Sequence, residues 1–169
     1  MRVAYSELED AFISGNYELQ HWLDKRTGEV ILISADTEHW ARGDYEIANA
    51  PEWQREEIER ARHVLRAVGE LERGEEVEET DRYLAIPTID SHEGYRTMED
   101  FVATVNNPRL RESLIEALRG RKPFRRFKDV LLDYGAEREQ WFAFERQRVR
   151  ETIEEWAEVE GIEIDFTQS

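Results

Sequence analysis

The segments YELQHWLD (residues 17–24), KRTG (25–28) and EVILIS (29–34) decide the fold of this chain. In the first segment Tyr, Leu, His and Leu alternate with Glu, Gln and Trp, which is the period-two pattern of a half-buried strand. The third segment is more continuously apolar and predicts a second, more buried strand. Between them, Gly28 stands at the loop position where a positive φ is needed. The stretch therefore predicts a β-hairpin.

Helical patterns flank this hairpin on both sides. Ser6 and Glu9 have the spacing of a capping box and predict a short helix that stops at Gly15. After the hairpin, residues 35–50 are polar and irregular and predict a loop. From Pro51 to about Arg73, apolar residues recur at helical spacing while Glu and Arg occupy the opposite face. This pattern predicts an amphipathic helix.

The second half of the chain is mainly helical. Residues 82–89 are apolar and β-prone, and Pro87 either confines this strand to a sheet edge or ends it. Four helices are predicted beyond it. Asp90 or Ser91 caps the first, and Asn107-Pro108 begins the second. The third runs from Pro123 to Gly135 and the fourth over residues 137–160, before a last strand at 162–166. We therefore predict one α+β domain over residues 1–169. Its small antiparallel sheet, the 17–34 hairpin plus an 82–87 strand, packs on a helical bundle.

The charge balance restricts the partners of this domain. Of 169 residues, 39 are acidic and 23 basic, so the formal net charge is −16. Such a field repels nucleic acid and anionic membranes on average and favours a basic protein partner, which we place at the acidic faces around residues 52–81. The chain has no cysteine, its first twenty residues include four acids, and no apolar run is long enough to span a bilayer. We expect a cytoplasmic protein without a membrane segment; the oligomeric state is not encoded in any pattern.

Residues 119–128 reverse this acidic character. The segment contains six basic residues and no acidic one, namely Arg119, Arg121, Lys122, Arg125, Arg126 and Lys128. It leads into a helix N-terminus, where backbone N–H groups and the helix dipole favour anions, so it is a candidate site for an anion, a nucleotide or a nucleic acid. The alternative, which the excess of acids favours, is that Phe124 and Phe127 are core residues and the cations pair with acids of the same chain.

The sequence Asp90-Ser91-His92-Glu93 is a second cluster of chemically useful side chains. Asp, His and Glu are ligand types for zinc, manganese or iron, so a metal-dependent hydrolase is one hypothesis. Consecutive residues do not converge easily on one ion, and no second His follows at helical spacing. The favoured interpretation is a helix cap, so we predict no metal site.

Motifs of known catalytic and cofactor sites are missing. The chain contains no HExxH, no GxSxG, no phosphate-binding GxxxxGK[ST] and no GxGxxG. Its four histidines are scattered. We accordingly predict no cofactor, name no catalytic residue and do not expect an enzyme.

Several motifs occur in a combination that is fairly specific. They are Leu8-Glu9-Asp10-Ala11-Phe12, Tyr83-Leu84-Ala85-Ile86-Pro87, Ser91-His92-Glu93-Gly94-Tyr95, Met98-Glu99-Asp100-Phe101, Phe124-Arg125-Arg126-Phe127-Lys128-Asp129, and Trp141 with Phe144 and residues 153–156. In this combination the chain resembles Uncharacterised Protein Family 0158 of bacteria. The resemblance implies a bacterial, cytoplasmic protein and supplies no reaction, cofactor or catalytic residue.

These observations leave three functional hypotheses. The first is a non-catalytic protein-interaction or regulatory module that meets a basic partner on its acidic faces. The alternative is anion, nucleotide or nucleic-acid binding through residues 119–128. The third is the metal-dependent hydrolase, which we rank last.

Overall fold

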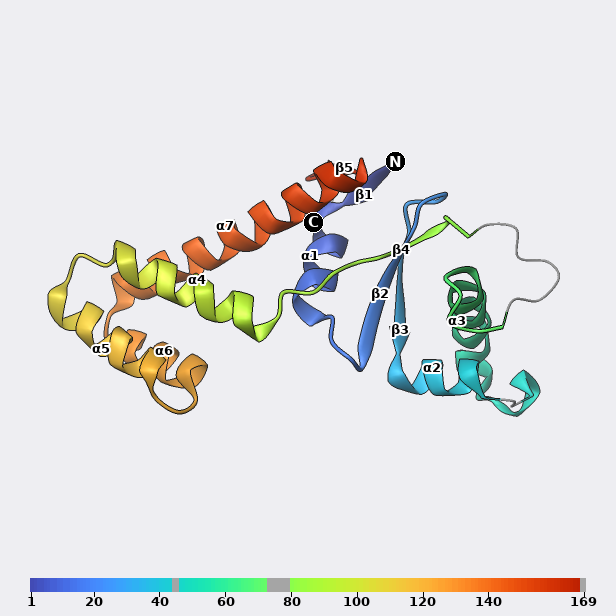
Figure 1. Ribbon diagram of the computed structural model, residues 1–169, viewed down its shortest axis with the longest axis horizontal. Coiled ribbons are helices and arrows are strands. Elements are labelled where there is room, and N and C mark those ends of the chain that lie inside the picture. The colour runs from blue at the N-terminus through green and yellow to red at the C-terminus, as the bar shows by residue number, and fades with distance from the viewer. Residues whose placement is uncertain (44–45, 73–79, 168–169) are drawn as a thin grey trace. The chain divides into compact units, whose positions relative to one another are not determined.

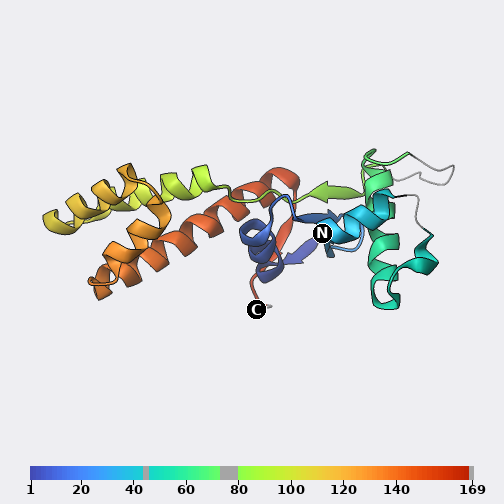
Figure 2. The same ribbon diagram turned by 90° about the horizontal axis from the view of Figure 1, so that it is seen from below.

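The computed structural model describes residues 1–43, 46–72 and 80–167 (Figures 1 and 2). The chain divides into two compact units, Met1–Thr88 with Glu155–Ser169 (unit 1) and Ile89–Glu154 (unit 2). Unit 1 carries 26 acidic and 10 basic residues, whereas unit 2 carries 13 of each. The net charge of −16 therefore belongs entirely to unit 1.

Unit 1 is built around the predicted hairpin. Its elements are β1 (Arg2–Ala4), α1 (Tyr5–Ser14), β2 (Leu19–Asp24), β3 (Val30–Ser34), α2 (Ala35–Arg42), the 3₁₀ turns η1 (Ile47–Asn49) and η2 (Glu52–Gln54), α3 (Arg55–Ala67), β4 (Tyr83–Ala85), the end of α7 and β5 (Glu163–Asp165). The antiparallel sheet has the order β3-β2-β4, so β4 is an edge strand, and it ends at Ala85, before Pro87. Gly28 has φ +79°, and a Cβ there would lie 2.9 Å from the Arg2 carbonyl oxygen. The predicted α+β fold class is confirmed.

The core of unit 1 forms where α3 packs on the sheet. Ile31 and Ile33 of β3 join Ile58 and Leu65 of α3 in one buried cluster. The helix ends at Ala67, earlier than predicted, because the chain turns back in a left-handed conformation at Gly69 (φ +82°). There the Glu70 N–H donates to the Leu65 carbonyl at 2.8 Å, which closes the helix end.

Two local predictions in unit 1 are wrong. Residues 35–50 are not a loop, since α2 and η1 occupy much of this range. Ser34 caps α2 by accepting a bond from the Thr37 N–H at 3.1 Å, and acids in the first turn favour the helix dipole. The Ser6–Glu9 capping box does not form, because α1 begins directly after β1 and both residues lie inside the helix.

The two ends of the chain pair with each other. The predicted C-terminal strand exists as β5 and pairs in parallel with β1, with Val3 opposite Ile164. This second sheet has two strands of three residues each. No local sequence pattern predicted the β1 strand.

Unit 2 is a helical bundle. It contains α4 (Ser91–Thr104), α5 (Pro108–Arg119), α6 (Pro123–Leu131) and most of α7 (Gly135–Glu160). Figures 1 and 2 both show α4 alongside α7. In the core, the Phe127 ring lies 4.9 Å from the Trp141 ring and 6.3 Å from the Phe101 ring, measured between centroids. The caps predicted at Asp90 and at Asn107-Pro108 are confirmed.

The third helix differs from its prediction in two respects, which are the residue at which it ends and the burial of one aromatic side chain. It ends at Leu131, and Gly135 begins α7 instead of closing α6. Phe127 is fully buried, but Phe124 is 39% exposed. Phe124 precedes Phe127 by three residues, which offsets the two side chains by about 60° around the helix, so Phe124 lies at the edge of the buried stripe. The prediction that both aromatics are core residues is wrong for Phe124.

Candidate functional site

The six cations of residues 119–128, hereafter the cationic segment, run from the last residue of α5 into α6. Gly120 ends α5, and Lys122 adopts φ +54°, which turns the chain into Pro123 at the start of α6. Arg126 folds back over this turn: a Cβ on Gly120 would lie 1.8 Å from Arg126 Nη1. All six cationic side chains are exposed.

Among the described residues, few acids pair with these cations. Within residues 1–43, 46–72 and 80–167, Arg125 is the one member of the segment with an ion pair, from its Nε to Asp129 Oδ2 at 3.9 Å. Both side chains of this pair are exposed, and such pairs contribute little to stability. The other five cations therefore lack, among the described residues, the internal ion pairs that the favoured alternative expects.

A cavity of about 440 Å³ opens beside the segment, within unit 2. Its walls come from α4, α6 and α7. Met98, Phe124, Trp141 and Val149 provide apolar surface, and Lys128 is the member of the cationic segment that lines it. Because these residues come from three separate helices, the cavity could not be found by a local motif.

Phe124 is fixed at this cavity although it is partly exposed. A Cβ added to Gly94 would lie 3.2 Å from Phe124 Cε1, so the ring packs closely on the backbone of α4. Lys128 follows Phe124 by four residues, which places both on the same face of α6. An aromatic ring and an ammonium group thus line one cavity together.

The cavity is lined by equal numbers of acidic and basic side chains, but these side chains differ in whether a partner within the described residues binds them. Arg148 donates to Asp100 Oδ2 at 3.0 Å, and Glu93 accepts a capping bond from the Asp90 N–H at 3.1 Å. In the part of the chain that the structure describes, Arg96 and Lys128 have no ion pair. The cations that a ligand could use are therefore on α4 and α6.

Trp141, which lines the cavity with other atoms, also contains a buried hydrogen-bond donor. The residue is 3% exposed, and its indole Nε1 has no hydrogen-bond acceptor among the described residues. A buried donor without an acceptor costs about 1–3 kcal/mol relative to a satisfied one.

The Asp90–Glu93 cluster is a helix cap. Asp90 Oδ1 accepts from the Glu93 N–H at 2.9 Å, and Glu93 Oε2 accepts from the Asp90 N–H, which is a reciprocal capping box. His92 is exposed. Among the described residues, no group of three His, Cys, Asp or Glu side chains is placed to hold a metal ion.

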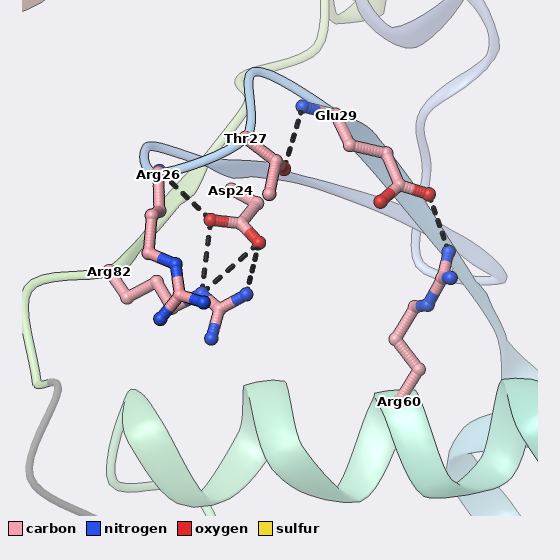
Figure 3. Close-up of polar contacts among 6 residues, drawn as sticks. All are labelled: Asp24, Arg26, Thr27, Glu29, Arg60 and Arg82. Carbon is pink, nitrogen blue, oxygen red and sulfur yellow. Dashed lines mark hydrogen bonds and ion pairs between the residues drawn. The ribbon is translucent and has the colours of Figure 1, made fainter.

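A different polar cluster, at the hairpin turn of unit 1, was not predicted from the sequence (Figure 3). Arg82 donates from Nε and Nη2 to the two carboxylate oxygens of Asp24, at 3.0 and 2.6 Å. The Arg26 N–H also donates to Asp24 Oδ1. Burial raises the pKa of Asp24, but the bonds from Arg82 and the turn backbone outweigh it and lower the pKa to about 2. This cluster joins β2 to β4 and is structural.

The predicted acidic surface lies partly within the described residues. Glu56 and Glu57 are exposed in the first turn of α3, whereas residues 73–79 lie outside the described ranges. Trp53, immediately before this helix, is 74% exposed. An exposed tryptophan beside acids is a second candidate surface, and it was not singled out from the sequence.

The fold and the site together define a two-unit α+β protein with an open cationic segment and a cavity in its helical unit. The model of Uncharacterised protein family (UPF0158) matches residues 63–169, more than half of the chain, so this protein belongs to UPF0158. UPF0158 protein PA5073 of Pseudomonas aeruginosa is 28% identical over 161 residues, which cover 95% of this chain and 86% of the relative. No solved structure matches this chain. None of the described helices combines the length and the apolar character of a bilayer span.

Proposed function

We propose that this protein is a non-catalytic binding module and that it binds a phosphate-bearing ligand, such as a nucleotide or a nucleic acid, through the cationic segment. The observation that carries this proposal is the exposure of all six cations, five of them without an ion pair among the described residues. Exposed cations can neutralise the phosphates of a polyanion, and the release of the counterions condensed on that polyanion favours binding.

The charge distribution between the units supports the same proposal. The repulsion expected from a net charge of −16 arises in unit 1, whereas unit 2 has as many basic as acidic residues. Screening at physiological salt limits the reach of exposed charges to about 8 Å. Unit 2, which carries the cationic segment, adds no net negative charge of its own against a phosphate.

The test is binding of a fluorescein-labelled single-stranded oligonucleotide, measured by fluorescence polarisation. We expect affinity to fall steeply between about 50 and 200 mM salt. Replacing Arg121 and Lys122 by Glu should weaken binding at low salt by at least about tenfold, because two phosphate contacts are lost and two repulsions gained.

The matched control is the double variant Arg109→Glu/Arg146→Glu. It changes the net charge by the same amount, uses exposed cations of the same unit, and touches neither the cationic segment nor the cavity. Equal losses in the two double variants, or no binding by the wild type at low salt, would remove the proposal.

A second candidate function is supported by Trp53. This side chain is 74% exposed directly before the acidic first turn of α3, and tryptophans are common binding hot spots. In this case the protein meets a basic protein partner on unit 1. The test is a pull-down from cell lysate in which capture by the wild type at moderate salt is lost in Trp53→Ala. A partner captured equally by both proteins contradicts this candidate.

A cytoplasmic location belongs to the same set of proposals. The cysteine-free sequence, which fits a reducing compartment, supports it. Fractionation of cells that produce the tagged protein tests it, and recovery with the membrane or secreted fraction contradicts it.

A further inference from the structure

The cavity of unit 2 has the size of a small-ligand site. Its volume of about 440 Å³ lies within the usual range of about 300–1,000 Å³. Its walls belong to one unit, so the site is complete in a single helical bundle. A site of this size accommodates a single ring system with a short substituent.

The apolar part of the cavity is suited to a planar ring. Phe124 offers a ring that is 39% exposed and held against Gly94, while Met98 and Trp141 are buried behind the surface. Aromatic rings pack favourably on one another in offset or edge-to-face arrangements.

The charged part of the cavity is suited to an anionic group. Lys128 lies one helical turn beyond Phe124, and Arg96 comes from α4. Both cations lack an ion pair among the described residues, whereas Arg148 is already engaged by Asp100. The Glu145 carboxylate lines the same cavity and could accept a bond from an amino group on the ring.

We infer that this cavity binds a small ligand in which a planar ring carries an anionic group, with the ring against Phe124 and the anion on Lys128 and Arg96. The inference rests on the proposed function, since Lys128 belongs to the cationic segment. It adds a second requirement, because the ligand must present a ring as well as a charge.

The experiment is isothermal titration of the full chain with adenosine 5′-monophosphate and with its two halves. Adenosine supplies the ring without the anion, and ribose 5-phosphate supplies the anion without the ring. We expect the complete nucleotide to bind at least tenfold more tightly than either half. Indole-3-acetate, a ring with a carboxylate, distinguishes a general need for an anion from a need for phosphate.

Variants of the cavity sharpen this test. Phe124→Ala removes the ring, Lys128→Glu reverses the charge, and Val149→Trp fills the space. Each should reduce nucleotide affinity by at least tenfold. The matched controls are Leu132→Ala, an apolar truncation at an exposed position of the same helix end, and Arg146→Glu, an exposed cation outside the cavity; both should bind like the wild type.

The oligonucleotide assay separates this inference from the proposed function. Loss of nucleotide binding in Val149→Trp, with retention of salt-dependent oligonucleotide binding, supports a distinct cavity site. If the wild type binds the oligonucleotide but binds the nucleotide no better than ribose 5-phosphate, the cavity inference is wrong and the proposed function survives. Unchanged nucleotide affinity in both Phe124→Ala and Val149→Trp also overturns it. Circular dichroism of each variant confirms that the helices are intact.

Discussion

The two units of this protein differ in how far their basic side chains are paired with acids. In unit 1 the arginines reach across the fold to acids, as Arg82 does to Asp24 and Arg60 to Glu29 at 2.6 Å (Figure 3). In unit 2 the numbers of acids and bases are equal, yet the cationic segment is largely unpaired within the described ranges. Pairing is thus decided by where acids are placed, not by how many the chain has. The comparison separates ionic groups that hold the fold from ionic groups that are available to a ligand.

The largest effect should come from the aromatic core of unit 2. Phe127 is fully buried between Phe101 and Trp141, so Phe127→Ala leaves a cavity and should lower the free energy of unfolding by about 3–5 kcal/mol. Urea denaturation followed by circular dichroism measures the loss. Phe124→Ala is the matched control and should cost less than half as much, because its ring is partly in water already. Similar losses in both variants would mean that Phe124 is a core residue after all.

Unit 1 should depend on its buried ion pair. The Asp24 and Arg82 side chains are 4% and 18% exposed, so Arg82→Met leaves a buried carboxylate without its partner and should cost about 3 kcal/mol. The control is Arg60→Met, whose pair with Glu29 is half exposed and should contribute less than about 1 kcal/mol. A double variant, Asp24→Asn/Arg82→Met, should recover part of the loss. Equal effects of Arg82→Met and Arg60→Met would contradict a special role for the Asp24 pair.

The same two variants test the prediction of a single domain over residues 1–169. Helix α7 supplies residues to both units. If the units unfold together, Phe127→Ala and Arg82→Met should lower one shared unfolding transition. Two separated transitions, each moved by only one of the variants, would divide the chain into two domains.

Acid should weaken unit 1 through Asp24. Its pKa is lowered to about 2 in the folded state, from an ordinary value of 3.8. The stabilisation is therefore complete above about pH 4 and is lost as the pH falls through about 2. After allowance for solvent screening, we expect a contribution on the order of 1 kcal/mol. Urea midpoints measured across this interval should fall less steeply in Asp24→Asn than in the wild type.

A second carboxylate, that of Asp165, also contributes to the acid sensitivity that this experiment measures. Hydrogen bonds from Thr167, together with the charge of Arg2, lower the pKa of Asp165. This residue is unchanged in Asp24→Asn, so the difference between the two proteins isolates Asp24. If the two pH profiles coincide, the Asp24 cluster does not contribute to acid sensitivity.

Local patterns predicted the parts of the fold that local interactions form. The hairpin follows from period-two alternation and Gly28, and the starts of α4 and α5 follow from Asp90 and Asn107 as caps. Helix α2 was missed because only Thr37 and Ala41 are buried along it, which leaves almost no apolar period. The β1–β5 pair was incompletely predicted because it joins the two chain ends through strands of three residues.

The site was predictable only in its charge. Six cations within ten residues are visible in the sequence, but whether acids cover them depends on distant segments. The exposure of Phe124 depends on its offset from Phe127 and on the backbone of Gly94. The cavity is lined by residues of α4, α6 and α7, and no linear motif predicts which residues of three helices come together.

The smallest expected effect is the most direct test of the comparison between the units. Among the residues that the structure describes, Arg125 makes the one ion pair of the cationic segment, 3.9 Å long and exposed on both sides. Arg125→Ala should therefore change the free energy of unfolding by less than about 0.5 kcal/mol, as for exposed helix pairs in general. Urea denaturation of this variant, beside Arg82→Met as the contrasting case, provides the measurement. A charge that is kept free for a ligand can be removed without cost to the unliganded protein. A loss above 1 kcal/mol would therefore mean that the cations of this segment stabilise the fold.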